Sequence, residues 1–314
     1  MVRYILRRLA QSAIVVLLVS LFAFSLLYLM PGDPVYAMMG GDITQEQYDI
    51  AYQQLGLDRP VIERYFDWIG SFLQGDFGRS YQNRMPVRDM IAARLPITLY
   101  LGFLSILIST AVGVIFGVIA STRRGKLSDA IITVFANLGA AVPLFWLAVM
   151  GMYVFSLKLG LLPAYGFSFP TQGLEMSIKQ CILPVSVLSV GAISGMTRQT
   201  RSSMLEVIAQ DYIRAARAKG LPEGRVVRSH ALPNALIPVI TLVGISFRNL
   251  VAGSVSVEKI FSIPGMGSML INAVLSKDVA VTQACILIIA VVICLSNLLV
   301  DISYAWLDPR IRLQ

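Results

Sequence analysis

The sequence predicts an all-α membrane protein with six transmembrane helices and both termini in the cytoplasm. First, 56% of its 314 residues are hydrophobic and only 14% are charged. In soluble domains about 45–50% of the residues are apolar and about 25% are charged. Second, the apolar residues form blocks whose lengths are close to the length that a membrane-spanning helix needs, about 20 residues. Third, Lys and Arg collect in alternate connecting segments, as they do in cytoplasmic loops.

Six blocks define the predicted spans. The block with one charge is Ala231–Val257, which contains Arg248. The uncharged blocks are Leu9–Gly32, Leu95–Thr122, Ala130–Leu157, Gln180–Thr197 and Val279–Val300. The first block is longer than a signal-peptide core and no small-residue cleavage site follows it, so we interpret it as a retained helix.

The charge distribution predicts the orientation. With the N-terminus inside, the cytoplasmic segments carry a large excess of Lys and Arg, whereas the outer segments carry slightly more acids than bases. The net charge of +8 therefore reflects membrane topology. Attraction to anionic membrane lipid is a secondary consequence, and we expect no nucleic-acid partner.

The spans divide the chain into three parts. We expect an N-terminal flank and first span over residues 1–31, an extracytoplasmic lid over 32–94, and a five-helix membrane core over 95–314 that contains a long basic cytoplasmic loop, 198–233. In the lid, Thr44 and Gln47 match a capping box, and a second helix is predicted to run from Pro60 to Gly75.

The basic loop is predicted to be helical in pieces. Asp211 can cap a helix that runs through Lys219 and ends at Gly220. Elsewhere, Pro143 and Pro184 are predicted to break helices within the spans. Small residues let membrane helices approach closely, and this role is assigned to Gly113, Gly117, Gly139, Gly151, Gly191, Gly195 and Gly244.

The motifs of common enzymes are absent from the sequence. It has no nucleotide-binding GxxxxGK[ST] sequence, and its one histidine, His230, lies on the opposite side of the predicted membrane from Ser268. A Ser–His dyad and a histidine-based metal site are therefore excluded. Cys181, Cys285 and Cys294 are expected to be small apolar packing residues. We expect no catalytic residue, bound cofactor or metal in this chain.

One pattern in the basic loop is specific. Arg214-Ala215-Ala216 is followed after three residues by Gly220, and nine residues later by His230-Ala231-Leu232-Pro233. This resembles the Glu-Ala-Ala, Gly, Ile-x-Leu-Pro motif of permease subunits in binding-protein-dependent ABC importers, with Arg214 in place of Glu and His230 in place of Ile. Other matching strings follow in order, including Gly75–Ser80, Glu258–Gly267 and Leu307–Arg312.

The chain is most similar to the first of two permease subunits in the dipeptide, oligopeptide and nickel branch. The resemblance implies a type I permease bundle in a bacterial or archaeal plasma membrane. It also implies a heterodimer with a second homologous permease, two cytoplasmic ATPases that bind ATP and Mg²⁺, and an extracytoplasmic solute-binding protein. Peptides are favoured over nickel because no span offers histidine.

A second interpretation is a stand-alone channel or secondary transporter. Ion-coupled transporters place acids near the membrane midplane, but the one acid assigned to a span is Asp301, which directly follows the block Val279–Val300 at its inner end. The ABC importer permease is therefore favoured. A nickel or other small-solute permease stays an alternative within that branch.

The resemblance assigns six residues to ATPase coupling: Arg214, Ala215, Ala216, Gly220, Leu232 and Pro233. Arg248 is a candidate for the translocation path because a central arginine is costly in a span; a pair across the heterodimer interface is the other interpretation. The outer segments Pro31–Arg94 and Glu258–Ala280 are expected to receive the binding protein.

Overall fold

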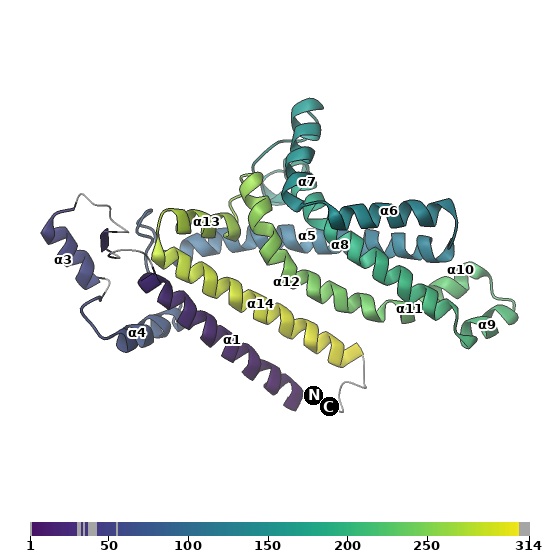
Figure 1. Cartoon of the computed structure of the whole chain (residues 1–314), viewed down its shortest axis with the longest axis horizontal. Helices are drawn as coiled ribbons and strands as arrows, with labels where there is room; N and C mark the ends of the chain where they lie inside the picture. Colours follow the sequence, from purple (N-terminus) through teal and green to yellow (C-terminus); the bar gives the residue numbers. More distant parts are fainter. Residues whose placement is uncertain (1, 30–32, 34, 37–42, 55, 308–314) are drawn as a thin grey trace. The chain divides into compact units, whose positions relative to one another are not determined.

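The computed structural model describes residues 2–29, 33, 35–36, 43–54 and 56–307, and the chain divides into two compact units (Figure 1). Unit 1 comprises Met1–Thr98 and Pro264–Leu298, and unit 2 comprises Leu99–Ile263 and Leu299–Gln314. The described residues are mostly helical, and the β-structure among them is one isolated bridge between Arg79 and Pro86.

Six potential spans agree with the predicted number. Four helices are long and apolar enough to cross a membrane, namely α1 (Val2–Leu29), α5 (Val87–Thr122), α8 (Leu174–Ile208) and α14 (Val279–Leu307). Two bent pairs pass the same test when each counts as one span. They are Leu127–Ala141 with Leu144–Lys158, bent by 104°, and Glu223–Ala235 with Ile237–Ser246, bent by 53°.

The two prolines predicted to break helices behave differently. At Pro143 the prediction is confirmed: α6 (Leu127–Ala141) ends, and α7 (Leu144–Gly151) starts in a new direction before it continues as the π-helix η1 (Met152–Lys158). At Pro184 the prediction is wrong, because α8 continues through it. One proline removes a single backbone hydrogen bond, which a long helix in a packed bundle can lose.

Unit 1 contains α1, the outer helices α3 (Gln45–Gln54) and α4 (Val61–Leu73), the start of α5, the short α13 (Met266–Leu275) and most of α14. The predicted capping box is confirmed, because Thr44 N donates to Gln47 Oε1 at 3.0 Å and Gln47 N donates to Thr44 Oγ1 at 3.3 Å. Pro60 is the N-cap of α4 and not its first helical residue.

Two aspartates organise the outer end of unit 1. Tyr48 OH donates to Asp33 Oδ2 at 2.7 Å, which lowers the pKa of Asp33 and raises the pKa of Tyr48 to about 12. Asp278 precedes α14 and is buried; it accepts hydrogen bonds from Ser80 Oγ at 2.6 Å and from Val281 N at 3.4 Å. These bonds hold the 79–86 turn against the start of α14.

Unit 2 is built around α8, which packs against α6, α7 and α12 (Ile237–Ile260). Its remaining short elements are η2 (Pro170–Gln172), α9 (Asp211–Ala218), α10 (Glu223–Arg225), η3 (Val226–Ala231) and α11 (Leu232–Ala235). Side by side in Figure 1, α5, α6 and α8 run along this unit, with α9 and α10 at one end. This arrangement brings the basic loop to the end of the α8 helix.

Several of the predicted small-residue contacts are present in unit 2. A methyl group added at Gly113 would overlap Met196, and one added at Gly117 would overlap Thr200. A Cβ at Gly139 would lie 2.7 Å from Ser194 Oγ. Gly191 and Gly195 are different, because an added Cβ would meet no atom within 4 Å. For these two glycines the prediction of close helix approach is wrong within this chain.

Candidate functional site

The basic loop folds against the end of α8 through a small apolar cluster. Ile213 and Ala216, one turn apart on α9, are both buried in it. The other buried members are Met204, Val226, Val227, Ala231 and Ala235. This packing fixes which face of α9 points inward, while Tyr212, Ala215 and Ala218 are exposed.

The ends of α9 differ slightly from the sequence prediction. Gln210 is the N-cap and Asp211 is the first helical residue, so the prediction that Asp211 caps the helix is wrong. An acid in the first turn still favours the helix through its dipole. At the other end Gly220 has φ +77, a left-handed conformation that favours glycine, and its N–H donates to Arg217 O at 2.9 Å.

Polar contacts tie α9 to the elements that follow it. Arg217 donates two hydrogen bonds to Glu223, Nε to Oε2 at 3.0 Å and Nη2 to Oε1 at 2.6 Å, and this pairing raises the pKa of Arg217. Asn234 Nδ2 donates to Tyr212 OH at 3.0 Å and to His230 O at 3.1 Å. The basic loop is therefore folded, with its own apolar core and its own hydrogen bonds between elements.

The six predicted coupling residues all lie in this folded piece, but they differ in exposure. Ala216 is buried and Leu232 is partly buried against the same cluster. The exposed members are Arg214, Ala215, Gly220 and Pro233. Arg214 contacts Asp211 through an exposed ion pair of 3.3 Å. Four of the six motif residues are thus exposed to solvent, and the other two pack in or against the apolar cluster.

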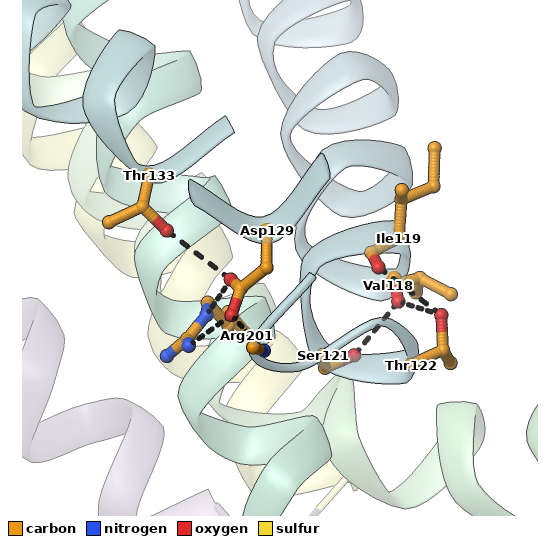
Figure 2. A network of polar contacts seen from close by, with 8 residues as sticks. Val118, Ile119, Ser121, Thr122, Asp129, Thr133 and Arg201 are labelled. Carbon is orange, nitrogen blue, oxygen red and sulfur yellow. Dashed lines mark hydrogen bonds and ion pairs between the residues drawn. The ribbon is translucent and has the colours of Figure 1, made fainter. Parts of the chain in front are cut away.

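An ion pair that sequence reasoning missed holds α6 to α8 near this site (Figure 2). Arg201 Nε donates to Asp129 Oδ1 at 2.7 Å and Nη2 donates to Oδ2 at 2.9 Å. Asp129 also accepts from Gly125 N at 3.0 Å and from Thr133 Oγ1 at 3.4 Å. Arg201 lies one turn before Met204, a member of the apolar cluster, on α8.

The sequence contains one signal that could have pointed to this pair. Asp129 is the single acid in a short loop that otherwise carries Arg123, Arg124 and Lys126. An acid in so basic a loop suggests a partner, but the partner is 72 residues away. The partner of Asp129 can be identified only once α6 is seen to pack against α8.

A cavity of about 330 Å³ lies within unit 2, among α5, α7, α8 and α12. Gly191 and Gly195 open onto it, and the hydroxyl groups of Ser105, Ser109 and Ser246 line it with apolar side chains. Each of these hydroxyls donates to a carbonyl of its own helix, so lone pairs remain as acceptors. None of the lining residues that the structure describes carries a charge.

Two further predictions concern charged groups. Arg248 lies in α12 just beyond the part of the helix that lines the cavity, but its side chain is outside the described residues. Among the residues that the structure describes, no group of three or more His, Cys, Asp or Glu could hold a metal ion.

Two family descriptions match the chain. The family of binding-protein-dependent transport system inner membrane components matches residues 113–313. The N-terminal part of binding-protein-dependent transport system membrane components matches residues 1–102. Together these matches include the lid and the folded basic loop.

Named relatives match from end to end. A putative peptide transport system permease protein of Brucella abortus is 39% identical over 312 residues, which are 99% of each chain. The oligopeptide transport system permease protein AppB of Bacillus subtilis is 39% identical over 317 residues, covering 99% of this chain and 100% of the relative. In structure, an inward-facing MetNI methionine ABC transporter chain aligns with a TM-score of 0.57 at 20% identity, covering 70% of this chain and 96% of that chain.

Proposed function

Because the chain belongs to the family of binding-protein-dependent transport system inner membrane components, we propose that it is the permease subunit of an importer that carries di- or oligopeptides into the cytoplasm. The observation that carries this proposal is the end-to-end match to relatives named for peptide and oligopeptide transport. ATP and Mg²⁺ bind to two partner ATPases, and this chain supplies no catalytic group.

The folded basic loop is the element through which those ATPases act. Its exposed α9 face combines Tyr212, Ala215 and Ala218, so small side chains beside one aromatic ring suit docking into a groove of a partner protein. The buried side anchors the helix in the apolar cluster at the end of α8. A push on α9 is thus transmitted to a long membrane helix.

The cavity in unit 2 forms part of the solute path together with a second, homologous permease subunit. Its hydroxyl acceptors and the uncharged side chains among its described lining residues suit the amide groups of a peptide backbone. Nickel is the less favoured solute, because the lining residues that the structure describes include no histidine or carboxylate. The outer segments 31–94 and 258–280 receive the solute-binding protein.

Uptake of labelled solutes tests the proposal. The complete importer is reconstituted in liposomes with ATP inside and the binding protein outside, and the uptake of a labelled tripeptide and of Ni²⁺ is measured in parallel. We expect ATP-dependent peptide accumulation that excess unlabelled peptide abolishes, and nickel uptake at the level of empty liposomes. Nickel accumulation without peptide accumulation, or solute entry without ATP, would contradict the proposal.

A further inference from the structure

Arg64 of α4 is a buried cation for which the structure shows no anionic partner. The residue is 8% exposed. Its Nη1 donates to Tyr28 OH at 2.5 Å, and its Cζ lies 5.4 Å from the Tyr28 ring centroid and 5.9 Å from that of Phe24. In the described part of the chain, no carboxylate forms an ion pair with it. A buried guanidinium in such a setting is costly until an anion joins it.

Arg64 lines a cavity of about 490 Å³ within unit 1. Arg59 and Arg79 also line it, as does Trp68. Arg59 is neutralised by Asp67, with Nη2 2.7 Å from Oδ2. Arg79 is exposed, and the described residues offer it no ion pair. Asp76 lines it as well and accepts a hydrogen bond from Gly78 N at 2.9 Å. Among the described lining residues, three arginines therefore face two aspartates, and the buried Arg64 has no ion pair, which suits an anionic group with several acceptor oxygens.

The cavity lies at the depth of the membrane–water interface. Phe24 and Leu27, at the outer end of α1, line it together with Val279 and Gln283 from the first turns of α14. Both helices are membrane spans, and the charge distribution assigns these ends to the outside. Tyr28 and Trp68 also match the aromatic residues typical of this level.

A second hollow follows the same two helices deeper into the membrane. It has a volume of about 380 Å³ and is lined almost entirely by apolar side chains. Leu17 of α1, Ile69 and Leu73 of α4, and Leu295 of α14 are among them. α4 thus lines the charged cavity with Arg64 and Trp68 and the apolar groove with its last turn.

We propose that unit 1 holds a phospholipid of the outer leaflet, with its phosphodiester on Arg64 and Arg79 and one acyl chain in the apolar groove. The charged cavity alone would also fit an acidic side chain of a partner protein. The apolar groove along the same helices favours a lipid, because an acyl chain fills it and a carboxylate does not. The lipid would fix α4, and with it the outer lid, against α1 and α14.

Lipid retention by the purified importer complex tests this site. Native mass spectrometry and thermal unfolding are followed while phosphatidylglycerol, dioleoylglycerol or inorganic phosphate is added to the delipidated complex. We expect phosphatidylglycerol to bind and to raise the melting temperature, and the other two to do neither. Arg64→Gln and Arg79→Gln should each weaken phosphatidylglycerol binding about 10-fold through loss of a charge-assisted contact.

Matched variants separate the two parts of the site. Arg88→Gln removes an exposed arginine that does not line the cavity, and it should leave lipid binding unchanged. Ala13→Phe fills the groove from an exposed position on α1 and should weaken lipid binding with both arginines in place. Because Arg79 is exposed, its variant reports on binding even where Arg64→Gln unfolds the protein.

Three results would overturn the proposal. Equal binding of dioleoylglycerol would show that the phosphate is not recognised. A thermal shift of the same size with inorganic phosphate would reduce the cavity to an anion site. Normal lipid binding by both arginine variants, with loss of stimulation by the solute-binding protein, would instead assign the cavity to an acidic side chain of that protein.

Discussion

At the scale of single residues, burial separates the ion pairs that stabilise the fold from those that do not. Asp129 is 6% exposed and is surrounded by the Arg201 fork, the Gly125 N–H and the Thr133 hydroxyl. Glu175 pairs with Lys179 at 2.5 Å, but its side chain is 83% exposed. Exposed pairs of this kind contribute little, because water competes for both charges.

The first prediction at this scale is that Asp129→Asn destabilises the protein by about 1–3 kcal/mol. The change removes the charge that Arg201 binds while it keeps the size of the side chain. Arg201 retains 30% side-chain exposure, so the loss stays below that of a fully buried pair. Thermal unfolding of the purified protein in detergent measures it.

Glu175→Gln is the matched control for that measurement. It removes one carboxylate charge from an exposed pair, and the expected change is within about 0.5 kcal/mol. Equal effects of the two variants would show that the Asp129–Arg201 pair does not hold α6 to α8.

At the scale of elements, α9 has two faces with different roles. Ile213 and Ala216 pack into the apolar cluster, whereas Ala215 and Ala218 are exposed. The motif by itself treats the alanines as equivalent small residues. Packing against Met204 of α8 places Ala216 in the internal core, so we expect docking to a partner to depend on Ala215 and Ala218.

We predict that Gly220→Val uncouples transport from ATP hydrolysis while membrane insertion stays intact. Gly220 has φ +77 and no atom within 4 Å of an added Cβ, so the backbone conformation, and not a steric clash, opposes valine. The substitution should alter the turn that aims α9. Peptide uptake and ATPase activity of the reconstituted importer are measured together, and uptake should fall at least 10-fold more than ATPase activity.

Gly224→Val is the matched control for the turn. Gly224 is also exposed with open space around it, but it lies in α10 and has no positive φ. Peptide uptake by the importer with Gly224→Val should stay within about twofold of the uptake by the parent. Normal uptake by Gly220→Val in an assembled importer would remove the coupling role from α9.

At the scale of the whole molecule, the chain is a multi-pass protein of the bacterial plasma membrane. Its bundle combines continuous helices with two bent spans. Arg248 lies mid-way along the sequence of α12. A central arginine costs about 2.5–3.5 kcal/mol on insertion scales and is therefore expected to have a partner or a path.

The prediction for Arg248 distinguishes a path from an interface. Arg248→Ala should lower peptide uptake several-fold while the heterodimer and its melting temperature stay unchanged, since a guanidinium in the path would hold the peptide carboxylate. Uptake assays and size-exclusion chromatography measure the two properties. Loss of the heterodimer would favour a pair across the subunit interface. Parent-like uptake and assembly of Arg248→Leu would exclude both roles.

Sequence alone predicts the number of spans, the orientation of the chain and the motif from Arg214 to Pro233. These features are one-dimensional, because membrane thickness sets the length of an apolar block and spacing alone identifies a motif. Local signals such as the Thr44–Gln47 capping box were also predictable, since both partners lie within one turn.

Features that depend on residues far apart in the sequence are visible only in the folded chain. The Asp129–Arg201 pair and the inward face of α9 require α8 to be in place. The glycines show the same division: Gly117 meets Thr200, whereas Gly195 faces a cavity, although the sequence treats both alike. The two prolines lead to the same prediction from sequence, yet Pro143 lies at a 104° bend and Pro184 lies inside a continuous helix. In each case the neighbours that a residue meets, and not its own chemistry, determine what it does.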